Sequence, residues 1–312
     1  MAYMVMRDRF DQFLIEKSLE KGVVLQEGSR VLRAAERGEE IEVELANGGR
    51  IRCAFLVGAD GPGSQVARSF SLNPSKESGG GMAIESEVPF ESVPTFPPEE
   101  SSSIHLDFGG IPNGYGWVFP KREGLSIGIG GMFKAGEKRD PRNYYHAFVQ
   151  KLPYLMDGQK GRIMGHSLPA FYDERQKVSL GNVLLVGDAA HLMDPLTGEG
   201  IYYAIRSGSL AAEAILRSKG SESSASDLYQ ASVVGHLFEN LRWALHLSRF
   251  VFRFTPLAYK TLKRYPELAT LYLRVLEGEN AYQGFVAEVK ERIRTYLGGR
   301  LTEKIRKAMP RT

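Results

Sequence analysis

Near the start of the chain, apolar residues recur first at helical spacing and then in strand-like runs. Between residues 9 and 21 apolar side chains recur at helical spacing, which predicts a helix with Asp8 as its N-cap and Gly22 just beyond its end. The apolar runs that follow predict strands at residues 23–31, 41–45 and 51–56. The chain therefore opens with a helix and continues in strands.

In the middle of the chain, apolar and polar residues alternate as they do in a mostly antiparallel sheet. Candidate strands lie at residues 82–88, 104–108, 116–120 and 125–129, and the polar stretch 121–124 joins the last two as a hairpin. Residues 79–161 are therefore predicted to form one antiparallel-sheet domain.

The second half of the chain returns to strand and helix. Residues 183–186 are wholly apolar, as in a strand buried in a parallel sheet. The helix predicted at 201–217 is apolar nearly all round, so we expect it to be buried. From Asp227 onward the chain is predicted to be helical, with breaks at Pro256 and Pro266. The mixture of elements predicts an α/β protein.

Composition narrows the class of protein. A length of 312 residues suggests about two domains. Cys53 is the single cysteine, which excludes an internal disulfide or a cysteine-cluster zinc site, and the histidines show no metal-ligand spacing, so no metal is expected. The sequence has no apolar run long enough for a membrane span and no secretory signal pattern at its start. A cytoplasmic location is the expectation.

The charge is unevenly distributed. A net charge of +3 is too small to indicate nucleic acid as a partner. Residues 236–312, however, carry 15 Lys and Arg against 7 Asp and Glu. This basic region indicates either an anionic partner, such as a membrane surface that the protein contacts peripherally, or simply a solvated helical face.

Residues 181–201 hold the most informative stretch, a buried strand followed by Gly-Asp-Ala-Ala-His at 187–191 and Gly-Glu-Gly at 198–200. The strand delivers Asp188 to its carboxyl end, where ligands bind in open α/β sheets. A carboxylate there can accept hydrogen bonds from a ribose or ribityl hydroxyl. Gly198 and Gly200 allow the backbone to approach a planar ring, and the following helix offers N–H groups to an anionic one. The stretch predicts a flavin site; the alternative is a tight connection without a ligand.

Three segments together resemble group A flavoproteins, which have the hydroxybenzoate hydroxylase fold. Residues 181–201 are similar to their second FAD-binding motif. Gly-Ala-Asp-Gly at 58–61 is similar to their Asp-Gly motif, and Arg-x-x-Phe-Asp-x-x-Leu at 7–14 resembles a segment whose arginine contacts FAD. The resemblance implies cofactor-binding roles for Arg7, Asp60, Gly61, Asp188, Pro195, Gly198, Gly200 and Ile201.

The aromatic residues at 115–119 narrow the resemblance. Strand alternation places Tyr115, Trp117 and Phe119 on one face, where they form either an apolar binding wall or the inner face of a core sheet. Tyr-x-Trp-x-Phe-Pro followed by Gly-x-Gly at 128–130 resembles the substrate-domain signature of the geranylgeranyl reductase family, although flavin halogenases carry a similar pattern. The resemblance implies that these three aromatic residues line a tunnel for a prenyl chain.

The family resemblance implies an FAD-dependent reductase that saturates isolated double bonds of a prenyl chain in a lipid, quinone or pigment, with NAD(P)H or another electron donor. It implies an FAD-binding Rossmann-like domain at 1–78 and 162–217, a substrate domain at 79–161 and C-terminal helices at 218–312. No Gly-x-Gly-x-x-Gly occurs in the sequence. We therefore expect the FAD-binding domain to lack its N-terminal segment, which could be supplied by a separate chain.

Two other functions remain open from the sequence. One is a flavin-dependent monooxygenase or halogenase on the same scaffold. The other is a non-catalytic lipid-binding or partner-dependent subunit. No catalytic residue is assigned: His191 is interpreted as a hydrogen-bonded structural residue, and Cys53 as an inert thiol in an apolar strand.

Overall fold

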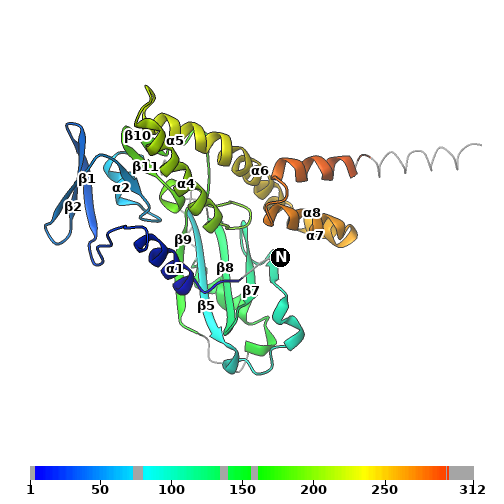
Figure 1. Cartoon of the computed structure of the whole chain (residues 1–312). Coiled ribbons are helices and arrows are strands. Elements are labelled where there is room, and N and C mark those ends of the chain that lie inside the picture. The colour runs from blue at the N-terminus through cyan, green and yellow to red at the C-terminus, as the bar shows by residue number, and fades with distance from the viewer. Residues whose placement is uncertain (1–3, 73–79, 134–139, 156–160, 293, 295–312) are drawn as a thin grey trace, which may run out of the picture. The chain divides into compact units, whose positions relative to one another are not determined.

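The structure is a computed structural model that describes residues 4–72, 80–133, 140–155, 161–292 and 294 (Figure 1). The chain divides into two compact units between Arg253 and Phe254. The first unit holds the sheets and helices α1 to α6, and the second holds α7 and α8. None of the described helices combines the length and apolar character needed to cross a membrane.

A five-stranded antiparallel sheet dominates the first unit, with strand order β6-β7-β8-β5-β9 (Figure 1). Its strands are β5 (Gly80–Pro89), β6 (His105–Phe108), β7 (Gly114–Pro120), β8 (Gly124–Phe133) and β9 (Ile163–Leu168). One face packs against α3 (Pro141–Val149) and forms a core around Val118, Leu125, Ile127 and Tyr145. The other face of the sheet is therefore available to the rest of the first unit.

The four predicted strands of this sheet are confirmed, but the fifth strand was not predicted. β9 pairs with β5 from Gly81↔Leu168 to Ser86↔Ile163. Its sequence, Ile-Met-Gly-His-Ser-Leu, has only one β-branched apolar residue, so it gave no strand signal. The strand begins immediately after the predicted boundary between residues 161 and 162, and the division into an FAD-binding and a substrate domain stays a prediction.

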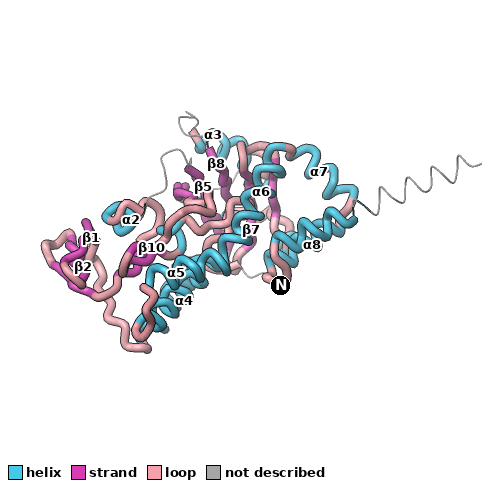
Figure 2. Tube along the Cα trace, turned by 90° about the horizontal axis from the view of Figure 1, so that it is seen from above, coloured by secondary structure: helices cyan, strands magenta, loops and turns pink. Residues whose placement is uncertain are grey.

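A small sheet, in the order β10-β11-β4, carries the predicted parallel strand. β11 (Val183–Leu185) is fully buried and runs parallel to β4 (Leu56–Gly58), while β10 (Ser179–Leu180) is antiparallel to β11. The helices α4 (Ile201–Ser218) and α5 (Ala225–Val233) pack against each other beside it, as Figure 2 shows. Tyr229 of α5 donates a hydrogen bond of 2.6 Å to the Leu185 carbonyl, which ties α5 to this sheet.

The prediction for residues 23–31 was wrong except at its last residue. The third sheet consists of β1 (Val31–Arg37), β2 (Glu40–Leu45) and β3 (Arg50–Cys53), and residues 23–30 form no strand. Val24 is 83% exposed, so the apolar run finds no partner strand within the described residues. Apolar composition alone does not make a strand when no neighbouring edge is available.

Two helical predictions also need correction. α1 spans Arg7–Leu19 with Met6 at its N-cap, so Asp8 lies inside the first turn rather than capping the helix. α4 was predicted to be buried, but Tyr202 and Leu216 are more than half exposed. The helix buries one stripe, which includes Tyr203, Leu210 and Ala214, against the core and leaves its other side open.

The chain after α5 is helical, as predicted. A π-helical segment (Val234–Phe238) joins α5 to α6 (Glu239–Arg253). In the second unit, α7 (Thr255–Arg264) has Pro256 in its first turn, and Pro266 precedes α8 (Glu267–Leu276). The two prolines therefore mark helix starts, as proline's missing N–H allows.

Candidate flavin site

The site begins where β11 ends. Residues Gly187–Ala190 form a single 3₁₀ turn, and His191 has the left-handed φ of 53°. This turn holds Asp188 at the carboxyl end of the buried strand, half-buried. Burial raises the pKa of the Asp188 carboxyl group, and the Arg7 charge only partly offsets this effect. Within the described part of the chain, the Asp188 carboxylate has no hydrogen-bond partner, which is the state of a group that a ligand can satisfy.

Asp194, which is 3% exposed, organises the loop that follows. Its Oδ1 accepts hydrogen bonds from the backbone N–H groups of Leu196 (2.7 Å) and Thr197 (3.0 Å). Its own backbone carbonyl accepts from the N–H of Gly198, where φ is +74°. Pro195 is buried inside this loop. The sequence contained Asp194 in the motif, but its loop-building role emerges only from the structure.

The loop delivers Gly200 to the start of α4. A Cβ atom on Gly200 would lie 3.5 Å from Oδ1 of Asp188, so the two predicted site residues are neighbours. Gly200 is the N-cap and offers no side chain to the helix, while Glu199 accepts a bond of 2.9 Å from the Tyr202 N–H. Ile201 is the first helical residue. The Asp188 carboxylate and the N-terminus of α4 therefore lie close together, with only the backbone of Gly200 between them.

Arg7 lies close enough to this site for charge coupling. Its guanidinium pairs with Asp11 at 2.9 Å within α1, and that hydrogen bond is the main cause of its raised pKa. The charges of Asp188 and of Glu85 on β5 raise it further. Arg7 therefore lies within range of charge coupling to Asp188 and Glu85, and its contact with a cofactor stays a prediction.

Asp60 has a local structural role. Its Oδ1 accepts a hydrogen bond of 2.5 Å from the Ser64 hydroxyl, and its Oδ2 accepts from the N–H groups of Gln65 (2.6 Å) and Val66 (3.2 Å) at the start of α2 (Gln65–Ser69). Gly61 takes a φ of +71° in the preceding turn. The Ala-Asp-Gly pattern therefore builds a capped turn here, and its contact with a cofactor stays a prediction.

The aromatic face of β7 turns toward the flavin loop. Tyr115 donates a hydrogen bond to the Thr197 carbonyl, and burial, with the charges of Asp194 and Glu199, raises the pKa of its phenol. Val118, on the opposite side of the strand, is in the sheet core. Tyr115 therefore lies between the sheet and the loop, on the face opposite the core that contains Val118, and the substrate-binding role of the three aromatic residues stays a prediction.

The aromatic residues form a continuous row. The Tyr115 and Trp117 rings are 6.1 Å apart, and the Trp117 and Phe119 rings are stacked at 6.0 Å. The indole lies directly over Gly128 of β8, where a Cβ atom would come within 2.2 Å of the Trp117 ring. Gly-x-Gly on β8 thus makes room for the indole, which explains physically why the two sequence patterns occur together.

A polar network adjoins this row, and sequence reasoning missed it. Glu85 of β5 accepts a hydrogen bond of 3.4 Å from the Ser126 hydroxyl, and its Oε1 lies 3.1 Å from Nε2 of His166 on β9. Ser126 accepts a bond of 3.3 Å from the Trp117 indole N–H. The available signal was strand alternation, which places Glu85 and its neighbour, the buried Ile84, on opposite faces of β5. Its partners could not be known without the register.

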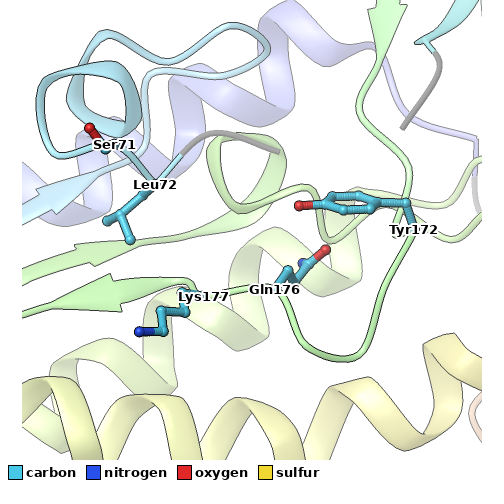
Figure 3. A pocket seen from close by; sticks show the side chains of 5 residues that line it. All are labelled: Ser71, Leu72, Tyr172, Gln176 and Lys177. Carbon is cyan, nitrogen blue, oxygen red and sulfur yellow. The ribbon is translucent and has the colours of Figure 1, made fainter. Parts of the chain in front are cut away.

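A pocket of about 260 Å³ borders the turn that follows β11 (Figure 3), because its lining residue Gln176 donates a hydrogen bond of 2.9 Å to the Ala190 carbonyl. It is lined by Ser71, Leu72, Tyr172, Gln176 and Lys177. Tyr172 meets His191 edge to face at 5.9 Å, and burial lowers the pKa of the His191 imidazole. His191 therefore packs against Tyr172, and its interpretation as a structural residue stays a prediction.

The residues present fit part of an FAD molecule. The unpartnered Asp188 carboxylate, the glycine loop and the α4 N-terminus suit ribityl hydroxyls and the edge of an isoalloxazine ring. None of the sequence matches the glycine-rich loop that holds a pyrophosphate. Among the described residues, no cluster of His, Cys, Asp or Glu could hold a metal ion.

Residues 1–230 match the FAD-binding domain family, and the chain belongs to that family. Its fold is the mixed α/β FAD-binding fold, here with an antiparallel sheet and C-terminal helices. Within this class it is a distant homologue of the digeranylgeranylglycerophospholipid reductases. The geranylgeranyl reductase resemblance seen in the sequence is thereby confirmed.

Three similar proteins illustrate this relationship. The chain is 29% identical to the uncharacterized protein Mbar_A1602 of Methanosarcina barkeri, over 90% of this chain and 70% of that protein. It is 30% identical to digeranylgeranylglycerophospholipid reductase 3 of Methanosphaera stadtmanae, over 66% of this chain and 52% of the reductase. A geranylgeranyl bacteriochlorophyll reductase-like crystal structure from Thermoplasma acidophilum matches with a TM-score of 0.69 and 24% identity, covering 79% and 63% of the two chains. The chain thus spans about half of the curated reductase.

Proposed function

We propose that this protein is an FAD-dependent reductase that saturates isolated C=C bonds of a prenyl chain carried by a lipid, quinone or pigment. The observation that carries the proposal is the hydrogen bond from Tyr115 to Thr197, because it holds the aromatic row against the loop that carries Asp188. An apolar wall and a flavin-type loop meet at one place. The distant homology to prenyl-lipid reductases supports the same substrate class.

The loop and α4 would hold the cofactor. Asp188 would accept hydrogen bonds from ribityl hydroxyls, while Gly198, Gly200 and the N–H of Ile201 would face the ring edge. Buried Pro195 would keep the loop in shape, and Arg7, Asp60 and Gly61 would lie at the outer parts of the molecule. When bound and reduced, FAD supplies the hydride; the donor that reduces it is NAD(P)H or another reductant.

The sheet would hold the substrate and its proton. Trp117 and Phe119 would cover the apolar chain and exclude water from the double bond. Saturation of C=C needs a hydride on one carbon and a proton on the other. We infer that the His166–Glu85 pair, in which Nε2 and Oε1 are 3.1 Å apart, holds that proton. Both side chains lie on the sheet face that carries the aromatic row.

The test is an anaerobic turnover experiment. The chain would be combined with FAD, dithionite and a geranylgeranyl-bearing lipid, with and without a separately expressed strand–Gly-x-Gly-x-x-Gly–helix segment from a prenyl reductase. We expect weak FAD retention by the chain alone, stronger retention with the segment, and hydrogen added pairwise to the lipid by mass spectrometry. A parallel aerobic incubation with NAD(P)H and chloride tests the rival activities, because oxygen or halogen added there by the FAD-loaded protein would establish a monooxygenase or halogenase. FAD binding without conversion in either incubation would indicate a lipid-binding subunit.

A further inference from the structure

We propose that α7 and α8 form a surface that binds an anionic lipid membrane. This inference concerns only the second unit and is independent of the proposed reductase activity. It starts from a bias within that unit: the ten residues of α7 contain no Asp or Glu but hold three basic residues, Lys260, Lys263 and Arg264. A stretch of this length with charges of one sign favours an anionic partner.

The structure adds exposed apolar side chains to this charge. No residue of α7 is buried, and Leu257 and Leu262 are 55% and 40% exposed. An α-helix turns by 100° per residue, so Leu257 and Leu262 lie on either side of the half-buried stripe formed by Ala258 and Thr261. Lys260 and Lys263 lie together on the other side of the helix. α7 is therefore amphipathic and has apolar groups available to a partner.

α8 adds exposed apolar side chains but no net charge, since it carries Glu267 and Arg274. Leu268 and Leu271 are buried, whereas Leu273 and Leu276 are each 47% exposed and lie three residues apart, on one helix face. Exposed apolar residues also occur on α1 and α4, so the feature that points to a partner is the position of the α7 leucines beside Lys260 and Lys263. A solvated basic helix would have no need for these leucines.

Charge complementarity selects the lipid surface among the possible occupants. Leucines beside lysines match the boundary between acyl chains and anionic headgroups, where each kind of side chain finds its preferred environment. Nucleic acid would satisfy the lysines but leave the leucines in water. A second copy that met this face across a two-fold axis would bring Lys260 and Lys263 toward the same lysines of its partner, which is repulsive. None of the described helices could span the membrane, so contact would occur at its surface.

Vesicle co-sedimentation tests the proposal on the full chain. Vesicles of phosphatidylglycerol and phosphatidylcholine in equal parts should pellet the protein at low salt, whereas phosphatidylcholine alone should not. Lys260→Gln with Lys263→Gln should lower the partition coefficient roughly 25-fold, since each cation near such a surface contributes about fivefold. The matched control is Arg217→Gln with Lys219→Gln, two exposed basic residues in the first unit, which should leave it unchanged.

A second pair separates lipid binding from internal packing. Leu257→Ser with Leu262→Ser should weaken vesicle binding about tenfold or more while leaving the thermal unfolding midpoint unchanged. Three results would overturn the proposal: no pelleting with anionic vesicles, equal pelleting by the lysine pair and its control, or a leucine pair that lowers the unfolding midpoint without affecting pelleting. Light scattering that shows a dimer lost in the leucine pair would identify a second copy as the occupant instead.

Discussion

Tyr115→Phe is the most informative single change, because it removes one hydroxyl and keeps the ring. The hydroxyl donates to the Thr197 carbonyl and joins β7 to the Asp188 loop. A hydrogen bond of this kind contributes about 0.5–1.5 kcal/mol, and a stranded acceptor adds to the loss. Thr197 is half-buried and can recover part of its hydration, so we expect a loss of about 1–2 kcal/mol in the free energy of unfolding.

Urea unfolding followed by tryptophan fluorescence measures this loss. Trp117 is 6.1 Å from the Tyr115 ring and reports on the same region. The control is Tyr202→Phe, because Tyr202 is 57% exposed and should change stability by less than about 0.5 kcal/mol. If Tyr115→Phe were as stable as this control, the hydroxyl would not hold the loop, and the argument that the aromatic row faces the flavin site would fail.

Three further predictions follow from individual residues. Burial raises the pKa of the Asp188 carboxyl group, so the contribution of this group to stability falls as the pH rises above the ordinary value of about 3.9. Asp188→Asn should remove this contribution, measured as the difference between parent and variant in urea titrations at several pH values, yet weaken FAD affinity by about 1.5–3 kcal/mol in fluorescence titrations. His166→Gln should slow prenyl reduction about a hundredfold at unchanged flavin content, whereas the exposed His146→Gln should not; equal rates would remove His166 as the proton holder. Tyr229→Phe should destabilise the chain by about 1–3 kcal/mol in urea unfolding, since it strands the buried Leu185 carbonyl, and an unchanged midpoint would mean that this bond is dispensable.

The parts of the site that are local in sequence could be predicted from it. Asp188, Gly198 and Gly200 lie on one strand–loop–helix segment, whose pattern specifies its own geometry. The alternation of Tyr115 and Trp117 placed both on one face, as the structure shows. What alternation could not tell was which face the core would occupy.

Features that depend on distant partners could not be predicted. Glu85 and His166 meet because β9 pairs with β5, and the sequence of β9 gave no strand signal. Asp60 follows a pattern shared by cofactor loops and capped turns, and only the hydrogen bonds to Ser64 and the α2 backbone reveal its structural role. The run that contains Val24 is apolar but finds no strand edge among the described residues, so composition alone was misleading there.

The most direct test of the proposed reductase is the mass spectrum of a geranylgeranyl lipid after anaerobic incubation with the FAD-reconstituted protein and dithionite, beside Trp117→Ala. The account predicts pairwise hydrogen addition to the prenyl chain by the parent and a marked loss of that conversion in Trp117→Ala, with equal flavin content in both. An FAD-loaded parent that leaves every prenyl double bond intact would contradict it.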